Sequence, residues 1–391
     1  MKKLISNPNF IYIISFIVPF VFYTLEWSTL YPALSSGLFI FYVFTFVVCA
    51  LLGIFINHIK PFNYSAVPVS NSNRLVLFVM YFLYVVEIIY SRKLPLLGLL
   101  TGSFSYSEDS FGIPVIHTFL VSFNTFFSIY LFHQYISNKK RALFYSFILS
   151  VLPFILLVYR SSILSVLIGV FVVYLLSREK ISGKTVAKSI VGIVFVLYLF
   201  GFLGNLRSGQ GDRTYIPRSS GATEKFLNGP VPFEFYWSYL YIASPVANLQ
   251  NNIDHTTRPA GTFKQLAINE CLPNFFIKFL PFLQVPVIDF YQINPFLNVG
   301  TTYVYSYSYL GWSGMLIFFF YFIILINLYY LIVARSAIYK VTGLAVLFNI
   351  IVFANFHNTI SYSASSVQMI YPVIFSMLKG FNYRIETSVQ G

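Results

Sequence analysis

Cationic side chains gather in one part of the chain, the segment 205–300, which separates two groups of apolar stretches. Its Lys and Arg residues are Arg207, Arg213, Arg218, Lys225, Arg258, Lys264 and Lys278. Its acids are slightly fewer: Asp212, Glu224, Glu234, Asp254, Glu270 and Asp289. A guanidinium group offers a planar fork of donors that matches the oxygens of a phosphate. The segment therefore predicts a site for an anionic ligand, although a solvated basic loop explains the same charges.

Arg160 lies outside that segment but has the same chemistry. The triplet Arg160-Ser161-Ser162 separates two long apolar runs, so the guanidinium group falls at the edge of a predicted hydrophobic layer. Inserting an Arg near a helix centre costs about 2.5–3.5 kcal/mol, and less at an edge from which the side chain reaches water. Arg160 is therefore either a cation that extends to the interface or a contact to a phosphate from the membrane side.

General-base candidates also fall in the segment 205–300. Transfer of a group to an acceptor hydroxyl requires a carboxylate or an imidazole that takes the proton. Glu234, Asp254 and the adjacent His255 have suitable side chains, and Glu224 is a fourth choice. Spacing does not select among them, and each is also explained as a solvated loop residue.

Two further titratable residues lie in or beside apolar stretches. Glu87 falls inside the stretch 75–91, and acids within apolar spans are rare and usually have a partner or a function. His117 follows Pro114 at the start of the stretch 113–136, where a structural role and a role in binding both fit.

Several kinds of site are excluded. The sequence contains no P-loop, no GxGxxG before a helix, no HExxH and no GxSxG. Cys49 lies in an apolar run and Cys271 in the segment 205–300, so the two cysteines predict neither a disulfide framework nor a metal set. We expect no metal and no cofactor.

The composition identifies the surroundings of the chain. Hydrophobic residues make up 57% and charged residues only 9%, with a mean hydropathy of +0.74. A soluble domain carries about 25% charged residues, so lipid must cover most of this surface. The net charge of +13 does not indicate nucleic-acid binding, because the Lys and Arg residues are scattered over short connections.

Apolar stretches predict an all-α polytopic membrane protein of about ten transmembrane helices, because backbone groups in lipid must be hydrogen-bonded within helices. The stretches are 9–25, 36–57, 75–91, 113–136, 142–159, 162–178, 187–204, 308–334, 340–356 and 366–381. Most Lys and Arg residues of the short connections fall on one side, which the positive-inside rule assigns to the cytoplasm. We therefore expect a multi-pass protein of the bacterial inner membrane, with both termini in the cytoplasm.

The segment between the seventh and eighth stretches is predicted to be one large periplasmic loop. The chain then divides into helices at 1–204, the loop at 205–307, and helices with a cytoplasmic tail at 308–391. Within the loop, 230–250 and 271–290 are half-apolar and interrupted by prolines, so we expect short helices in the outer interface. A twelve-helix alternative makes both of them true spans.

Four short stretches carry a resemblance to a known family. The first is Leu94-Pro95-Leu96-Leu97 with Tyr106 and Phe111-Gly112-Ile113-Pro114-Val115-Ile116-His117, and the second is Arg160-Ser161-Ser162-Ile163-Leu164. The third is Gly201-Phe202-Leu203-Gly204-Asn205-Leu206-Arg207-Ser208. The fourth is Asn298-Val299-Gly300-Thr301-Thr302, with Tyr305, Tyr309 and Gly311-Trp312-Ser313-Gly314. With the overall plan of many spans and one outer loop, the chain resembles the Wzy-type O-antigen polymerases.

That resemblance implies a metal-independent glycosyltransferase of the multi-span, lipid-donor type. Such an enzyme transfers a growing glycan from undecaprenyl diphosphate to a new lipid-linked repeat unit at the periplasmic face. The resemblance implies functional roles for Arg160 and Arg207, and more weakly for Tyr106 and His117. With Arg213 and Arg218 from the basic segment, these residues form the predicted diphosphate-binding set.

The sequence leaves two other functions open. A lipid-linked oligosaccharide flippase needs charged residues along a cavity through the spans, where the sequence offers mainly Glu87 and His133. An O-antigen ligase uses the same donor, and the sequence separates it poorly from a polymerase. Expected partners are the lipid-linked donor and acceptor and membrane lipid, with no nucleic acid; contact with a chain-length regulator is left open.

Overall fold

The computed structural model describes residues 2–59, 62–101, 111–208 and 212–378, except for the side chains of Leu203 and residues 206–208. Tyr106 of the predicted site lies outside the described residues. All named elements within these ranges are helices, and one isolated bridge pairs Ser28 with Ala222. The predicted all-helical class is confirmed.

The predicted apolar stretches coincide with helices. Five helices are long and apolar enough to cross a membrane: α3 (Ser36–Ile59), α4 (Asn73–Ser91), α8 (Arg160–Ser177), α9 (Gly183–Ser208) and α15 (Val304–Val333). Shorter apolar helices are α2 (Pro8–Tyr23), α7 (Arg141–Leu156), α16 (Lys340–Phe353) and Ser363–Leu378, whose first turns are α17 (Ser363–Ser366) and η2 (Val367–Met369). The stretch at 113–136 forms α6 (Ile116–Asn138). The chain is therefore a helical, membrane-type protein, and the number of true spans stays a prediction.

The remaining described helices are short, apart from α12 (Phe235–His255). They are α1 (Lys2–Ile5), α5 (Pro95–Leu100), α10 (Tyr215–Ser219), α11 (Glu224–Leu227), α13 (Phe263–Asn269), α14 (Asn274–Phe279) and η1 (Pro281–Leu283). The stretch 271–290 thus holds helices of only six and three residues. A spanning helix needs about 20 residues, so 271–290 forms no spanning helix, and the choice between ten and twelve spans stays a prediction.

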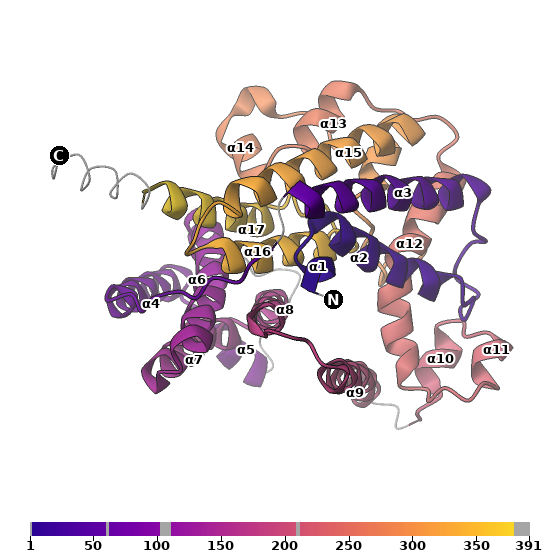
Figure 1. Ribbon diagram of the computed structural model, residues 1–391. Coiled ribbons are helices and arrows are strands. Elements are labelled where there is room, and N and C mark those ends of the chain that lie inside the picture. Colours follow the sequence, from indigo (N-terminus) through magenta and orange to yellow (C-terminus); the bar gives the residue numbers. More distant parts are fainter. Residues whose placement is uncertain (1, 60–61, 102–110, 209–211, 379–391) are drawn as a thin grey trace.

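α12 is longer than the short interfacial helix predicted for 230–250. It has 21 residues, continues through Pro245, and packs against α2, α9 and α15 (Figure 1). Its amides hold the chain that returns to α15, because Asn248 donates to the carbonyl of Val299 at 2.7 Å and Asn252 to that of Val304 at 3.1 Å. The predicted loop therefore contains a packed structural helix.

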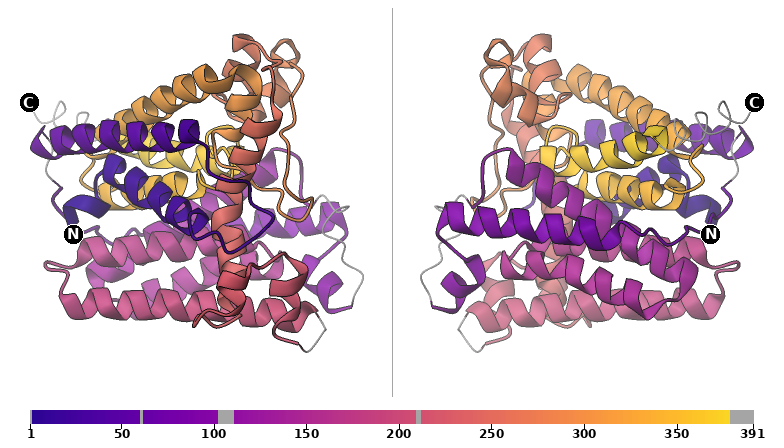
Figure 2. Two further views of the ribbon diagram at one scale, coloured as in Figure 1. Left: turned by 90° about the vertical axis from the view of Figure 1, so that its right-hand side faces the viewer. Right: turned by 90° about the vertical axis from the view of Figure 1, so that its left-hand side faces the viewer.

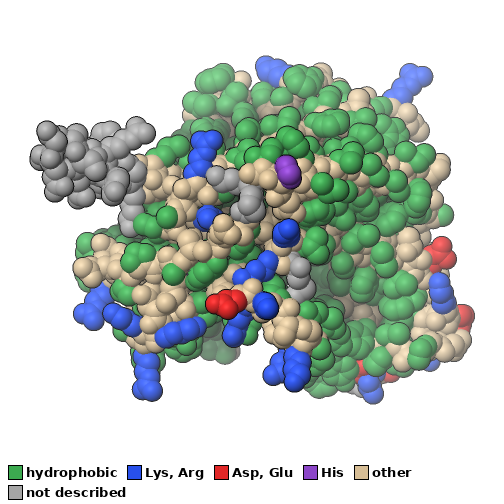
Figure 3. Space-filling view, viewed as in Figure 1, with side chains coloured by type: hydrophobic (Ala, Val, Ile, Leu, Met, Phe, Trp, Pro, Cys, Tyr) green, Lys and Arg blue, Asp and Glu red, His purple; other side chains and the backbone are tan. Residues whose placement is uncertain are grey.

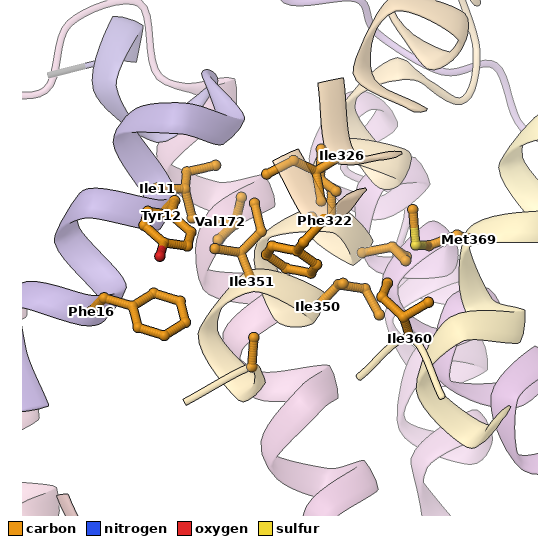
Figure 4. Packing of buried hydrophobic residues seen from close by; sticks show 14 of the residues in the cluster. Ile11, Tyr12, Phe16, Val172, Phe322, Ile326, Ile350, Ile351, Ile360 and Met369 are labelled. Carbon is orange, nitrogen blue, oxygen red and sulfur yellow. The ribbon is translucent and has the colours of Figure 1, made fainter. Parts of the chain in front are cut away.

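The core joins helices that are far apart in the sequence. Figure 4 shows side chains of α2, α8, α15 and α16 packed together, among them Phe16, Val172, Phe322 and Ile351. Lipid is as apolar as these side chains, so association in a membrane depends on close packing and on polar contacts between helices. Asn9 and Asn327 supply such a contact through reciprocal amide hydrogen bonds of 2.8 and 3.0 Å.

Lys and Arg side chains gather at one end of the bundle. The start of α1 and the turn between α8 and α9 lie at the same end, as the spacing of Lys and Arg predicts (Figure 2). Figure 3 looks onto this end, and Lys and Arg outnumber Asp and Glu over it. The positive-inside rule assigns this end to the cytoplasm, and that orientation stays a prediction.

Gly201 of α9 allows its close approach to the start of α12. A Cβ built on Gly201 would lie 1.7 Å from the carbonyl oxygen of Glu234, whereas one on Gly192 would meet nothing within 4 Å. We predict that Gly201→Ala destabilises the protein by about 1–3 kcal/mol, because the added methyl group overpacks a backbone contact. Gly192→Ala, in the same helix, should change stability by under about 1 kcal/mol. Thermal unfolding in detergent measures both, and equal midpoints would contradict the proposed contact.

Candidate functional site

A cavity of about 220 Å³ lies where the starts of α6 and α8 meet the segment 353–368. It is lined by polar side chains from all three, among them His117, Tyr159, Ser161, Ser162, His357 and Gln368. Two of these, His117 and Gln368, belong to chain segments more than 250 residues apart, so the cavity exists only in the folded bundle.

A carboxylate, an imidazole and a phenol form a continuous chain at this cavity. His117 Nδ1 lies 2.8 Å from Glu87 Oε2, and the Tyr159 hydroxyl lies 2.7 Å from His117 Nε2. A neutral His117 that donates from Nδ1 to the carboxylate accepts at Nε2, because each nitrogen of the neutral ring has one role. Glu87 thereby fixes the tautomer that leaves Nε2 basic and directed toward Tyr159.

Burial makes the pairing of Glu87 necessary. Its side chain is 1% exposed in α4, and its Oε1 has no hydrogen-bond partner. An unpaired ionised carboxylate in such surroundings is strongly disfavoured, and a paired one is retained when a hydrogen bond and an opposite charge are available. The contact with His117 supplies both whenever the imidazole is protonated.

The local sequence before α6 positions His117. Gly112 has φ +91° and donates its backbone N–H to the Ser91 hydroxyl at 2.8 Å, which ties the segment to the end of α4. A Cβ on Gly112 would lie 2.5 Å from His117 Nδ1, so only glycine fits against the imidazole. Val115 precedes the helix with φ +70°, a conformation that β-branched residues rarely adopt.

The start of α8 forms the second wall. Val158 has φ +59°, Tyr159 is the N-cap, and Arg160 is the first helical residue. The first N–H groups of a helix have no intrahelical acceptor and carry partial positive charge, which favours an anion. Ser161 and Ser162 line the cavity beside them, while the Arg160 side chain is exposed and does not line it.

The third wall is the connection between α16 and α17. Gln368 is 7% exposed with no hydrogen-bond partner for its Oε1, and His357 Nε2 is likewise unpartnered. Unsatisfied buried polar atoms cost free energy, and a polar ligand in the cavity would satisfy them. This wall is braced from outside, because Phe275 donates its backbone N–H to the Ser363 hydroxyl at 2.9 Å.

Two predicted site residues, Arg213 and Glu234, pair with each other instead of forming separate parts of a site. Arg213 Nε donates to Glu234 Oε1 at 2.6 Å, and Glu234 is 1% exposed at the N-cap of α12. The ion pair neutralises one predicted phosphate ligand and one predicted base. Neither lines the cavity.

Asp254 and His255 lie at the other end of α12 from Glu234. A 21-residue helix is about 30 Å long, so the three general-base candidates do not share one site. Both side chains are exposed; Asp254 accepts from the Gln250 amide at 2.7 Å, and His255 Nδ1 donates to the Asn251 carbonyl at 2.8 Å.

The other cations of the predicted diphosphate-binding set lie in different parts of the structure. Arg160 and Arg218 are both exposed and neither lines the cavity, although Tyr159 and Ser161, the neighbours of Arg160 in the chain, do line it. Arg207 lies in the last turn of α9, with its side chain outside the described residues. Where the chain is described, no group of three His, Cys, Asp or Glu side chains could hold a metal ion.

Sequence reasoning missed the cavity residues Tyr159, His357, Tyr362 and Gln368. A usable signal was the polar run Asn355-Phe356-His357-Asn358 between two apolar stretches. Such a run is unnecessary for a plain connection and is common where backbone lines a cavity.

Comparison with protein-family models, with curated proteins and with solved structures gives no match to this chain. The chemistry of the cavity is therefore what indicates a function.

We predict that Gly112→Ala disables the cavity through His117. The new methyl group would overlap the imidazole, and alanine at φ +91° is strained, so the ring must leave its position between Glu87 and Tyr159. The rate of the reaction at the cavity should fall about 100-fold or more, as for loss of a positioned acid–base group. Gly183→Ala, where a Cβ would meet nothing within 4 Å, is the matched control. Wild-type activity in Gly112→Ala would show that the ring position is unimportant.

Stability should depend on pH through Glu270, which braces the third wall. Asn358 donates its amide to Glu270 Oε2 at 2.8 Å, yet burial raises the pKa of Glu270 to about 7 from an ordinary 4.5. The carboxyl contributes fully to stability below pH 4.5, and this contribution is lost as pH rises toward 7, by about 3 kcal/mol in all. Glu270→Gln should flatten this part of the curve of unfolding temperature against pH. A curve as steep as wild type would rule out Glu270 as its source.

Proposed function

We propose that this protein is an O-antigen polymerase: a metal-independent glycosyltransferase that moves a glycan from undecaprenyl diphosphate to a new lipid-linked repeat unit at the periplasmic face. The observation that carries the proposal is the chain Glu87–His117–Tyr159 at a cavity beside the N-terminus of α8. This arrangement offers a base and an anion-binding helix end within one cavity.

The proposed base is His117 in place of Glu234, Asp254 or His255. Its Nε2 accepts the Tyr159 proton at 2.7 Å, and an acceptor hydroxyl in the cavity could take the place of the phenol or pass its proton through it. Glu87 stabilises the imidazolium that results, because its carboxylate accepts from Nδ1. The resemblance to the polymerase family gave His117 a weaker role in diphosphate binding, and the geometry favours acid–base work.

The proposed anion site is the first turn of α8. Departure of a lipid diphosphate builds negative charge, and fixed donors stabilise charge that develops in a transition state. The helix N-terminus and the hydroxyls of Ser161 and Ser162 are such donors, and Arg160, the first residue of the same helix, adds a guanidinium group to this turn. The donor's own sugar–diphosphate bond supplies the energy, which suits a face of the membrane without nucleotide.

The size of the cavity limits what it can hold. Sites for drug-sized ligands are about 300–1,000 Å³, and water takes about 30 Å³ in the liquid. A volume of about 220 Å³ therefore suits a diphosphate or a single sugar, and not a whole repeat unit. The proposal places the reacting groups in the cavity and the rest of both glycans outside it.

We predict that His117→Gln abolishes polymerisation in a deletion strain. Removing the base should lower the rate about 100- to 10,000-fold, so the ladder of lipopolysaccharide on a gel should shrink to a single repeat unit. His255→Gln and Glu234→Gln serve as controls and should keep the ladder. Arg160→Ala and Arg207→Ala should also lose it, at unchanged protein levels.

The same gel separates the competing functions. Loss of all O-antigen on deletion, with no single repeat unit left, would indicate a ligase or a flippase. A normal ladder in His117→Gln with loss in His255→Gln would move the catalytic site to the far end of α12 and contradict the proposed cavity.

A further inference from the structure

A second cavity lies at the opposite ends of the helices that form the first. It has a volume of about 290 Å³, where the C-terminal ends of α6 and α8 meet the segment that follows α3. Its polar lining consists of Tyr64, Ser137, Lys139, Tyr174, Ser177 and Arg178. Nothing in the proposed reaction uses these residues.

The two cations of this cavity are held in the same way. Lys139 and Arg178 are the C-caps of α6 and α8, and each lies four residues after a tyrosine. The Lys139 ammonium lies 5.8 Å from the Tyr135 ring centroid, and the Arg178 guanidinium lies 4.5 Å from that of Tyr174. Arg178 also donates to the Tyr174 hydroxyl at 2.8 Å. Cations restrained in this way lose less freedom on binding a ligand.

The charge balance leaves a surplus for an anion. Each helix C-terminus carries about half a negative charge, so two of them offset about one of the two cations. No Asp or Glu is among the described residues that line the cavity. Glu179 follows Arg178, but Lys140, Arg141 and Lys180 lie in the same connections. About one positive charge therefore remains, and a ligand with a single negative charge, such as a phosphodiester, matches it.

The hydroxyl groups fit the same ligand. Tyr64 and Ser137 lie 3.1 Å apart as a hydrogen-bonded pair, and Ser137 also accepts the Val67 N–H at 3.1 Å. Hydroxyls can rotate to donate to phosphate oxygens, which accept several hydrogen bonds. The lining therefore combines charge with adaptable donors.

The length of the two helices sets the depth of the cavity. α6 has 23 residues and α8 has 18, so the two cavities are about 27–35 Å apart, close to the thickness of a hydrocarbon layer. The second cavity lies at the end of the bundle that Figure 3 shows, where Lys and Arg gather. With one cavity at headgroup depth in one leaflet, the other is at headgroup depth in the opposite leaflet.

We propose that this second cavity binds the phosphodiester headgroup of an anionic phospholipid in the leaflet opposite the proposed reaction. Basic pockets between helices at this depth suit such headgroups. The lipid is favoured over free phosphate because a phosphodiester has one charge and its acyl chains remain in the hydrocarbon layer beside α6 and α8. The inference does not depend on the proposed glycan transfer.

The test compares two double variants that remove the same charge. Lys139→Gln with Arg178→Gln empties the cavity of cations, and Lys140→Gln with Lys180→Gln removes two neighbouring cations that do not line it. Native mass spectrometry of the purified full-length protein counts bound phosphatidylglycerol against phosphatidylcholine. At about 1 kcal/mol per cation, we expect the first variant to bind phosphatidylglycerol about 30-fold more weakly. The second should change binding less than about 3-fold at physiological salt, because exposed charges are screened.

Three results would overturn the inference. Equal weakening in both double variants would show diffuse surface attraction. Equal retention of phosphatidylcholine and phosphatidylglycerol by the wild type would show no headgroup selectivity. Stabilisation by inorganic phosphate as strong as by phosphatidylglycerol would show a site for the free anion. If the first double variant does not fold, Lys139→Gln and Lys140→Gln at adjacent exposed positions give the same comparison, with about a 5-fold loss expected only for Lys139→Gln.

Discussion

A carboxylate enclosed in an apolar bundle is the constraint on which the candidate site depends. Glu87 is almost completely buried, and the contact that compensates its charge is the imidazole of His117 at 2.8 Å. Breaking one partner of a buried pair is far more costly than the pair is stabilising, so the start of α6 cannot move away from α4. Tyr159 then closes on the other nitrogen of the same ring, and α8 is fixed as well. One electrostatic requirement thereby sets the relative positions of three helices and forms the wall of a cavity.

Backbone strain is concentrated at the same place. Val115 and Val158 have positive φ angles; Val115 directly precedes α6, and Val158 precedes the N-cap of α8, and both helices bear part of the site. A β-branched residue in this conformation costs about 1–3 kcal/mol, and such strain persists only where the surroundings enforce it. Here the Glu87–His117–Tyr159 contacts enforce it from both sides. A relaxed start at either helix would rotate His117 or Tyr159 out of line, so the strain is consistent with a geometry required for chemistry.

The helices could be predicted from the sequence because a run of apolar residues is a local property. The prolines around 230–250 argued against a long helix there. Two of them precede α12, however, and Pro245 is accommodated within it. Contacts between side chains of different helices could not be predicted, because no local pattern in the sequence specifies them. Glu87 and His117 each drew attention separately, but a contact between residues 30 apart depends on how α4 and α6 pack. The contact between Glu234 and Arg213 could not be predicted from the sequence for the same reason.

The close contact between α6 and α8 links the two cavities. A Cβ on Gly169 of α8 would lie 2.4 Å from Ile129 of α6, so the two helices approach as closely as glycine allows and cannot slide past one another. Their starts define the first cavity and their ends the second, and both cavities move only if the pair moves as a unit. The separation of the two sites is thus determined by helix rise and not by flexible connections. A frame of this kind holds reacting groups at a fixed depth in one leaflet, and a lipid bound at its other end would anchor that depth.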